Sequence, residues 1–122
     1  MSQGYEQKLK GLVDSIPGAL CASLTGTDGI GISFYQAGLD LDPTLADAEF
    51  ATMLSASRRA AENLSMGTLA EQMVATEKYT ILIRLVGTDF YLGVVFQQGA
   101  GNLGMARLLM RRASEELKNL LY

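Results

Sequence analysis

The chain has no histidine, no tryptophan and a single cysteine, Cys21. One cysteine excludes a disulfide within the chain, and without histidine it cannot complete the usual zinc ligand sets. Serine–histidine and cysteine–histidine catalysis are excluded for the same reason. The remaining carboxylates, lysines, arginines and tyrosines show no pair with the spacing of a general acid and base or of an activated nucleophile. We therefore expect a protein that is not an enzyme and that needs no metal or cofactor.

Charge is also scarce. Charged residues make up 19% of the 122 residues, hydrophobic residues 48%, and the net charge is −3. This composition favours one compact domain over residues 1–122 and gives no general attraction to nucleic acid or anionic membranes. No apolar run approaches the roughly 18 residues of a membrane span, and the first residues lack the features of a signal peptide. We expect a cytoplasmic protein with neither nucleic acid nor membrane as partner.

Hydrophobic periodicity and turn signals predict an α+β fold in the order α-β-β-α-β-β-β-α. The expected arrangement is a five-stranded antiparallel sheet with helices on both faces. The elements are helices over Ser2–Ser15, Leu45–Ser65 and from Leu103 onward, and strands over Ala19–Thr25, Gly31–Gln36, Leu69–Ala75, Thr80–Val86 and Tyr91–Phe96.

Capping residues and a core stripe define the two later helices. Thr44, after Pro43, is the expected N-cap of the central helix, and Asn102 that of the last helix. The core face of the last helix is predicted to consist of Leu103, Ala106, Met110, Ala113, Leu117 and Leu120.

The segment Gly99–Gly104 matches the dinucleotide-binding pattern G-x-G-x-x-G letter for letter. That pattern needs a second parallel strand after the helix, with an acidic residue at its end. The chain ends with the helix that follows Gly104, so the second strand has no place. We interpret the glycines as a turn into the last helix.

Two other features are interpreted as structural. Asp40, Asp42 and Asp47 resemble part of a calcium loop but lack its glycine and its terminal glutamate, so they indicate a solvated acidic loop. Cys21 lies in an apolar strand without a basic neighbour, which predicts a buried, unreactive thiol.

Self-association is predicted by two independent features. The central helix carries alanine or serine nearly all round, so it offers a small-residue face beyond the stripe that covers the sheet. The strand over Leu69–Ala75 is expected at an edge of the sheet, where unpaired backbone groups favour pairing with another chain. The residues expected in the dimer interface are Phe50, Met53, Leu54, Ser57, Ala60, Ala61, Leu64, Leu69, Glu71 and Met73.

Several segments in this order resemble the roadblock/dynein light-chain domain family, which has a profilin-like platform fold. They are Ile16–Ala19 before the first strand, Thr27–Gly29 in the hairpin, the alanine-rich central helix, and Asn102–Arg107. The resemblance implies a homodimer, or a heterodimer with a paralogue, formed by side-by-side central helices and by pairing of the Leu69–Ala75 strand. It also implies binding of a Ras-like small GTPase, with modulation of GTP hydrolysis as a further expectation.

The expected partner-binding surface is the exposed part of the central helix. Its residues are Asp47, Glu49, Arg58, Arg59 and Glu62. An alternative for Arg58 is an ion pair with Glu62 on a solvated helix face. Arg107, Arg111 and Arg112 are interpreted as a solvated face of the last helix.

Two other functions remain open. One is a structural adaptor that bridges larger proteins, as dynein-associated relatives do. The other is a small-molecule sensor, which the tight aliphatic filling of the strands makes less favourable.

Overall fold

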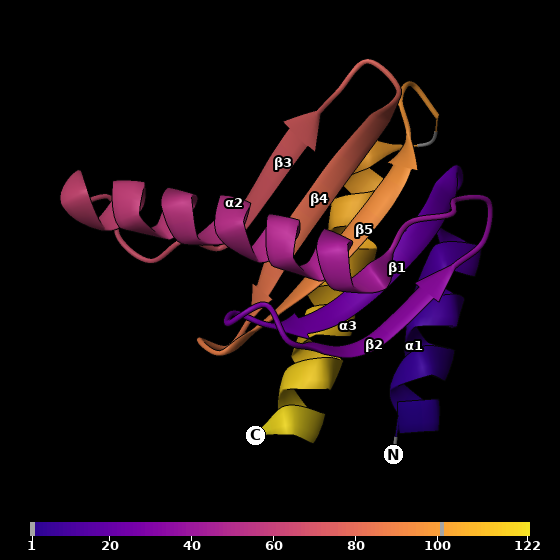
Figure 1. Ribbon diagram of the computed structural model, residues 1–122, viewed down its shortest axis with the longest axis horizontal. Helices are drawn as coiled ribbons and strands as arrows, with labels where there is room; N and C mark the ends of the chain where they lie inside the picture. Colours follow the sequence, from indigo (N-terminus) through magenta and orange to yellow (C-terminus); the bar gives the residue numbers. More distant parts are fainter. Residues whose placement is uncertain (1, 101) are drawn as a thin grey trace.

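The computed structural model describes residues 2–100 and 102–122 as three helices and a five-stranded sheet (Figure 1). The elements are α1 (Ser2–Ser15), β1 (Ala19–Gly26), β2 (Gly31–Gln36), α2 (Pro43–Asn63), β3 (Glu71–Ala75), β4 (Tyr79–Val86), β5 (Phe90–Gln97) and α3 (Leu103–Leu121). Within these residues, no helix combines the length and the apolar character that crossing a bilayer requires.

The strands lie in the order β2-β1-β5-β4-β3, and every neighbouring pair is antiparallel. The predicted α+β fold and element order are therefore confirmed. Strand β3 lies at one edge, as predicted, and β2 lies at the other. Helices α1 and α3 cover one face of the sheet, and α2 crosses the opposite face (Figure 1).

Because side chains alternate along a strand, the sheet contributes to two separate cores. Leu24, Leu82 and Leu92 point toward α1 and α3, and each is at most 1% exposed. Ile83 and Tyr91 point toward α2 and are fully buried. Each fully buried side chain of this size contributes about 1.5–3 kcal/mol, so the sheet anchors both helical layers.

Helix α2 begins two residues earlier than expected. Asp42 is its N-cap: the Asp42 carboxylate accepts hydrogen bonds from the backbone N–H groups of Thr44, at 3.0 Å, and Leu45, at 3.4 Å. The prediction of Thr44 as N-cap was wrong because Pro43, which has no N–H to satisfy, fits the first helical position. The helix ends at Asn63, and Ser65 and Gly67 follow with positive φ.

The core stripe of α3 is shorter than predicted. Ala106, Met110 and Leu117 are buried and Ala113 is half-buried, but Leu103 and Leu120 are 39% and 57% exposed. In the last turn of α3, Leu121 packs against the core in place of Leu120, and Tyr122 packs edge-on against Phe90 of β5. The helical period alone could not show which of Leu120 and Leu121 takes the core position.

Candidate interaction surface

Helix α2 presents a long surface of small side chains to solvent. In its second half, Leu54 packs on the sheet and Arg58 contacts the β4–β5 turn, whereas the C-terminal end of the helix extends beyond β3 (Figure 1). The exposed side chains of this half are Ser55, Ala56, Arg59, Ala60, Glu62 and Asn63. Alanine and serine permit a close approach of backbones, so a second helix could pack here at short interaxial distance.

Strand β3 borders the same region with an unpaired edge. It pairs with β4 on one side, and no other described strand pairs with it. Gln72 on β3 faces the α2 side, because it is in register with Ile83, which packs against α2. The side-chain oxygen of Gln72 is buried without a hydrogen-bond partner among the described residues. The backbone groups at the free edge of β3 are the ones that a second chain could pair with.

Two residues of the predicted interface lie in the core of the protomer instead. Phe50 and Leu54 are 7% and 1% exposed and pack against the α2 side of the sheet. Their side chains are not available to a second chain, so their assignment to the interface is corrected. An amphipathic helix must first bury its largest apolar residues on its own sheet.

Glu71 is also occupied within the protomer. Its carboxylate accepts a 3.0 Å hydrogen bond from Arg84 on the neighbouring strand, and it forms an ion pair with Arg107 of α3. The Glu71 side chain is therefore engaged within the protomer, and its place in an interface stays a prediction. Arg107 is exposed, as predicted, although it also pairs with Glu71. Arg111 and Arg112 are exposed, as predicted.

The remaining members of the predicted interface lie at or near the surface. Met53, Ser57, Ala61 and Leu69 are half-buried, whereas Ala60, Leu64 and Met73 are exposed. Met73 faces the α1–α3 side, because it is in register with the core residue Leu82. The interface itself stays a prediction.

Arg58 does not pair with Glu62 in the described part of the chain. Instead its guanidinium donates a 3.2 Å hydrogen bond to the carbonyl oxygen of Thr88, in the turn between β4 and β5. This bond ties α2 to the sheet and holds Arg58 half-buried, whereas Arg59 is exposed. Of the predicted partner-binding residues, Glu49, Arg59 and Glu62 are therefore the exposed ones.

Asp47 is buried, not exposed on the partner-binding surface. It is 4% exposed, and its carboxylate accepts a 2.9 Å hydrogen bond from the hydroxyl of Thr25. The hydroxyl of Tyr91 donates to the backbone carbonyl of Asp47 at 2.9 Å. Burial raises the pKa of Asp47 above its usual value, and the Thr25 hydrogen bond partly opposes this shift. Sequence reasoning missed this cluster, because Thr25, Asp47 and Tyr91 come from three distant segments.

Cys21 is fully buried beside this cluster, as predicted. Burial, with a smaller contribution from the charge of Asp47, raises the pKa of the thiol to about 12. The described residues contain no group of three potential metal-ligating side chains, and two of the aspartates in the acidic segment have other roles. Asp42 caps α2 and Asp47 is buried.

The glycine-rich segment leads into α3. The side chain of Asn102 accepts a 3.1 Å hydrogen bond from the backbone N–H of Met105, which confirms Asn102 as the N-cap. Gly101, in the middle of the motif, lies outside the described residues. Every strand pair in the described residues is antiparallel, so β5 and α3 are not part of the parallel βαβ unit of a dinucleotide fold.

An antiparallel five-stranded platform with one helix on one face and two on the other defines the architectural class. Residues 6–96 match the family model of the Roadblock/LC7 domain, and the chain belongs to this family. The uncharacterized protein MJ1340 of Methanocaldococcus jannaschii is 32% identical over 95 residues, which cover 78% of this chain and 81% of that protein.

Two solved structures from Myxococcus xanthus are similar over nearly all of the chain. MglB superposes with a TM-score of 0.89 at 22% identity, covering 98% of this chain and 89% of MglB. MglC superposes with a TM-score of 0.68 at 32% identity, covering 98% of each chain. Both likenesses support the fold, and family membership rests on the match to the family model.

Proposed function

We propose that this Roadblock/LC7 protein is a non-enzymatic dimer that binds a Ras-like small GTPase as a regulator or scaffold. Family membership supports a role in protein–protein interaction. The dimer is supported by two neighbouring surfaces that lack a packing partner: the half of α2 with small exposed residues, and the unpaired edge of β3.

Each of these surfaces gains from a second copy. Pairing two β3 strands across a two-fold axis would extend the sheet and satisfy backbone groups at the edge. The same operation would bring the exposed halves of two α2 helices together at Ala56 and Ala60.

The GTPase would bind beside this seam. Glu49, Arg59 and Glu62 place both signs of charge on the exposed surface of α2. Arginine is favoured at interface hot spots because its guanidinium forms several hydrogen bonds with little loss of side-chain freedom. Two paired α2 helices would present this charge pattern twice, across a composite surface.

Nucleotide-dependent binding tests the proposal. The purified protein is immobilised and exposed to candidate Ras-like GTPases loaded with GDP or with a non-hydrolysable GTP analogue. Recovery of a GTPase in one nucleotide state but not the other is the expected result. Recovery of no GTPase in either state would contradict the GTPase assignment, and equal recovery in both states would contradict a regulatory role that depends on the nucleotide.

The structural adaptor is the second candidate, and the free edge of β3 favours it, because an extended peptide can pair with such an edge. A partner recovered regardless of nucleotide, and lost when a proline is placed at Met73, whose N–H points away from β4 to the free edge, would support the adaptor. A proline removes a backbone donor and so weakens strand pairing.

A further inference from the structure

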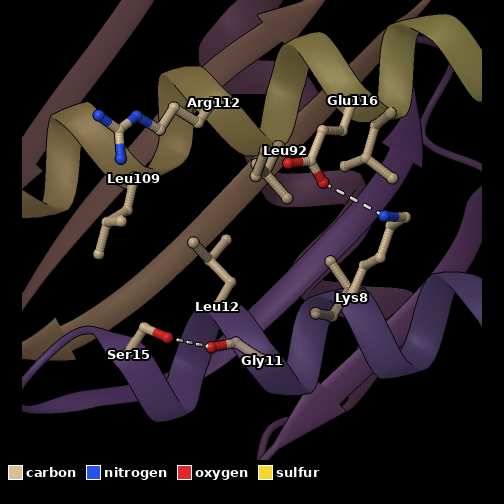
Figure 2. A pocket seen from close by; sticks show the side chains of 11 residues that line it. Lys8, Gly11, Leu12, Ser15, Leu92, Leu109, Arg112 and Glu116 are labelled. Atoms are coloured by element: carbon tan, nitrogen blue, oxygen red, sulfur yellow. Dashed lines mark hydrogen bonds and ion pairs between the residues drawn. The ribbon is translucent and has the colours of Figure 1, made fainter.

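A groove lies between α1 and α3, on the sheet face opposite α2 (Figure 2). The cavity has a volume of about 330 Å³. Leu12 projects into it from α1, and Leu92 of β5 forms part of its floor. At one end, Lys8 reaches across to Glu116 with an N–O distance of 3.2 Å and closes the groove.

The α1 side of the groove combines Lys8, Leu9 and Leu12 with two small residues, Gly11 and Ser15. Gly11 lies in the interior of α1, and a Cβ atom at this position would meet no other atom within 4 Å. A glycine in a helix interior is destabilising relative to alanine, and no contact within the protomer requires one here. The hydroxyl of Ser15 donates to the carbonyl oxygen of Gly11 at 2.7 Å, so it is satisfied locally. At Gly11 and Ser15 the side chains are therefore short enough for the backbone of another helix to approach α1.

The α3 side is apolar and cationic. Leu109 lines the groove, and the Arg112 side chain extends along α3 toward it (Figure 2). Met105 and Leu108, on neighbouring turns, are 46% and 43% exposed. These side chains extend the apolar surface of the groove along the outer side of α3.

The layer formed by α1 and α3 differs in net charge from the whole chain. Together α1 and α3 carry six basic and four acidic residues, a net charge of +2, whereas the whole chain has a net charge of −3. Lys8 pairs with Glu116 and Lys10 with Asp14. Arg112 forms no ion pair within the described part of the chain, so it is available to a carboxylate from outside.

We propose that the α1–α3 groove docks an amphipathic helix from a partner protein, with apolar residues on one face and acidic residues beside them. Its apolar side chains would enter over Gly11, between Leu12 and Leu109, and a carboxylate would pair with Arg112. Helices commonly dock in such grooves through residues spaced i, i+3, i+4 and i+7. Helix α3, one wall of the groove, lies outside residues 6–96 that match the family model. The groove is separated from the α2 surface by the sheet, so both could be occupied together.

Two synthetic peptides test this proposal on the full-length protein. Each peptide is an amphipathic helix of about 18 residues with leucines at positions i, i+3, i+4 and i+7. The leucines are flanked by glutamates in one peptide and by lysines in the other. Fluorescence anisotropy is expected to show at least about tenfold tighter binding of the glutamate peptide. Amide shifts in NMR spectra should map to residues 8–15 and 105–116. Equal affinities, or shifts that map to α2 or β3, would overturn the proposal.

Variants sharpen the test. Arg112→Glu should reverse the preference between the peptides, whereas the matched control Arg111→Glu, about 100° around the helix, should leave it unchanged. Gly11→Phe should lower the affinity for the glutamate peptide at least about tenfold. Gly11→Ala should preserve the fold and bind this peptide with an affinity within about twofold of the natural protein's. Arg111→Glu acting like Arg112→Glu would overturn the proposal. So would a concentration-dependent rise in mass that Gly11→Phe abolishes, because the occupant would then be a second copy of this chain.

Discussion

The hydroxyl of Thr25 in β1 and the carboxylate of Asp47 in α2 form a 2.9 Å hydrogen bond beneath α2. Both residues are buried, and Thr25 is fully inaccessible. Since Asp47 lies in the first half of α2, this bond fixes the helix against the sheet and so orients the exposed second half. The proposed dimer seam depends indirectly on this buried contact.

The stability of the protein should respond to pH through Asp47. Burial raises the pKa of Asp47 above its ordinary value of 3.8, so the folded protein keeps the proton over a range where the unfolded chain has lost it. The free energy of unfolding therefore falls as the pH rises above 3.8 and through the raised pKa. Asp47→Asn cannot ionise, so its stability relative to the natural protein should increase over the same range. Urea unfolding at a series of pH values measures this difference.

A matched variant separates Asp47 from the other carboxylates. Glu49→Gln removes an exposed carboxylate two residues away and should change stability by less than about 0.5 kcal/mol at every pH. An Asp47→Asn curve that runs parallel to that of the natural protein would show that Asp47 does not titrate differently in the folded state.

Alanine substitutions at two glycines should distinguish the cost of backbone strain from the cost of a steric clash. Gly18 and Gly99 have φ of 83° and 79°, but a Cβ at Gly18 would lie 2.6 Å from Cβ of Ala100, and one at Gly99 would meet nothing within 4 Å. Gly99→Ala should cost about 1–2 kcal/mol from the left-handed conformation alone. Gly18→Ala should cost clearly more in thermal or urea unfolding. The double variant with Ala100→Gly should recover the excess, and failure to recover it would place the cost elsewhere.

Cys21 should be unreactive in the native protein. Its thiol is fully buried and has a pKa of about 12, so almost no thiolate is present or accessible at pH 8. Labelling by a thiol-reactive disulfide reagent should be at least about 100-fold slower than in the urea-unfolded chain, because it needs an opening of the structure. Equal rates in native and unfolded protein would contradict the burial of Cys21.

A bulky charge at the proposed seam should dissociate the dimer. Ala60→Glu, or Ala56→Arg, places a long charged side chain where two α2 helices would approach closely. Light scattering should show about twice the 13.1 kDa protomer mass for the natural protein and the single mass for the variants. Ala37→Glu, at an exposed alanine in the loop before α2, serves as control and should stay dimeric. An unchanged mass for both seam variants would remove these positions from an interface.

The two neighbouring arginines of α2 should behave differently. Arg59→Glu should spare folding and reduce GTPase binding by at least about tenfold, because Arg59 is exposed on the proposed surface. Arg58→Glu also removes the hydrogen bond to Thr88, so it should cost about 1 kcal/mol of stability. Binding by isothermal calorimetry and unfolding in urea measure the two effects. Intact affinity in Arg59→Glu would remove this residue from the contact.

Much of the fold could be predicted from local features. The helical period, the alternating strands and the turn glycines define the element order, and the side chain of Asn102 defines the start of α3. These signals act over a few residues, through backbone sterics and local hydrogen bonds. The placement of β3 at an edge could also be predicted, because β3, β4 and β5 follow one another through short turns.

The surface of α2 could not be assigned in the same way. Its sequence offers apolar and small residues nearly all round, and only packing on the sheet decided that Phe50 and Leu54 are covered while Ala56 and Ala60 are exposed. The partners of Asp47 and Glu71 come from distant segments, so no local pattern shows that both carboxylates are already used.

By itself, the sequence determined the order of the elements and the absence of the residues that histidine- and zinc-dependent chemistry requires. Only the tertiary structure decided which side chains remain available at the surface, and it formed the α1–α3 groove from two helices at opposite ends of the chain. The physical reason is that a helix or strand forms through short-range interactions, whereas exposure depends on what long-range packing places above each side chain.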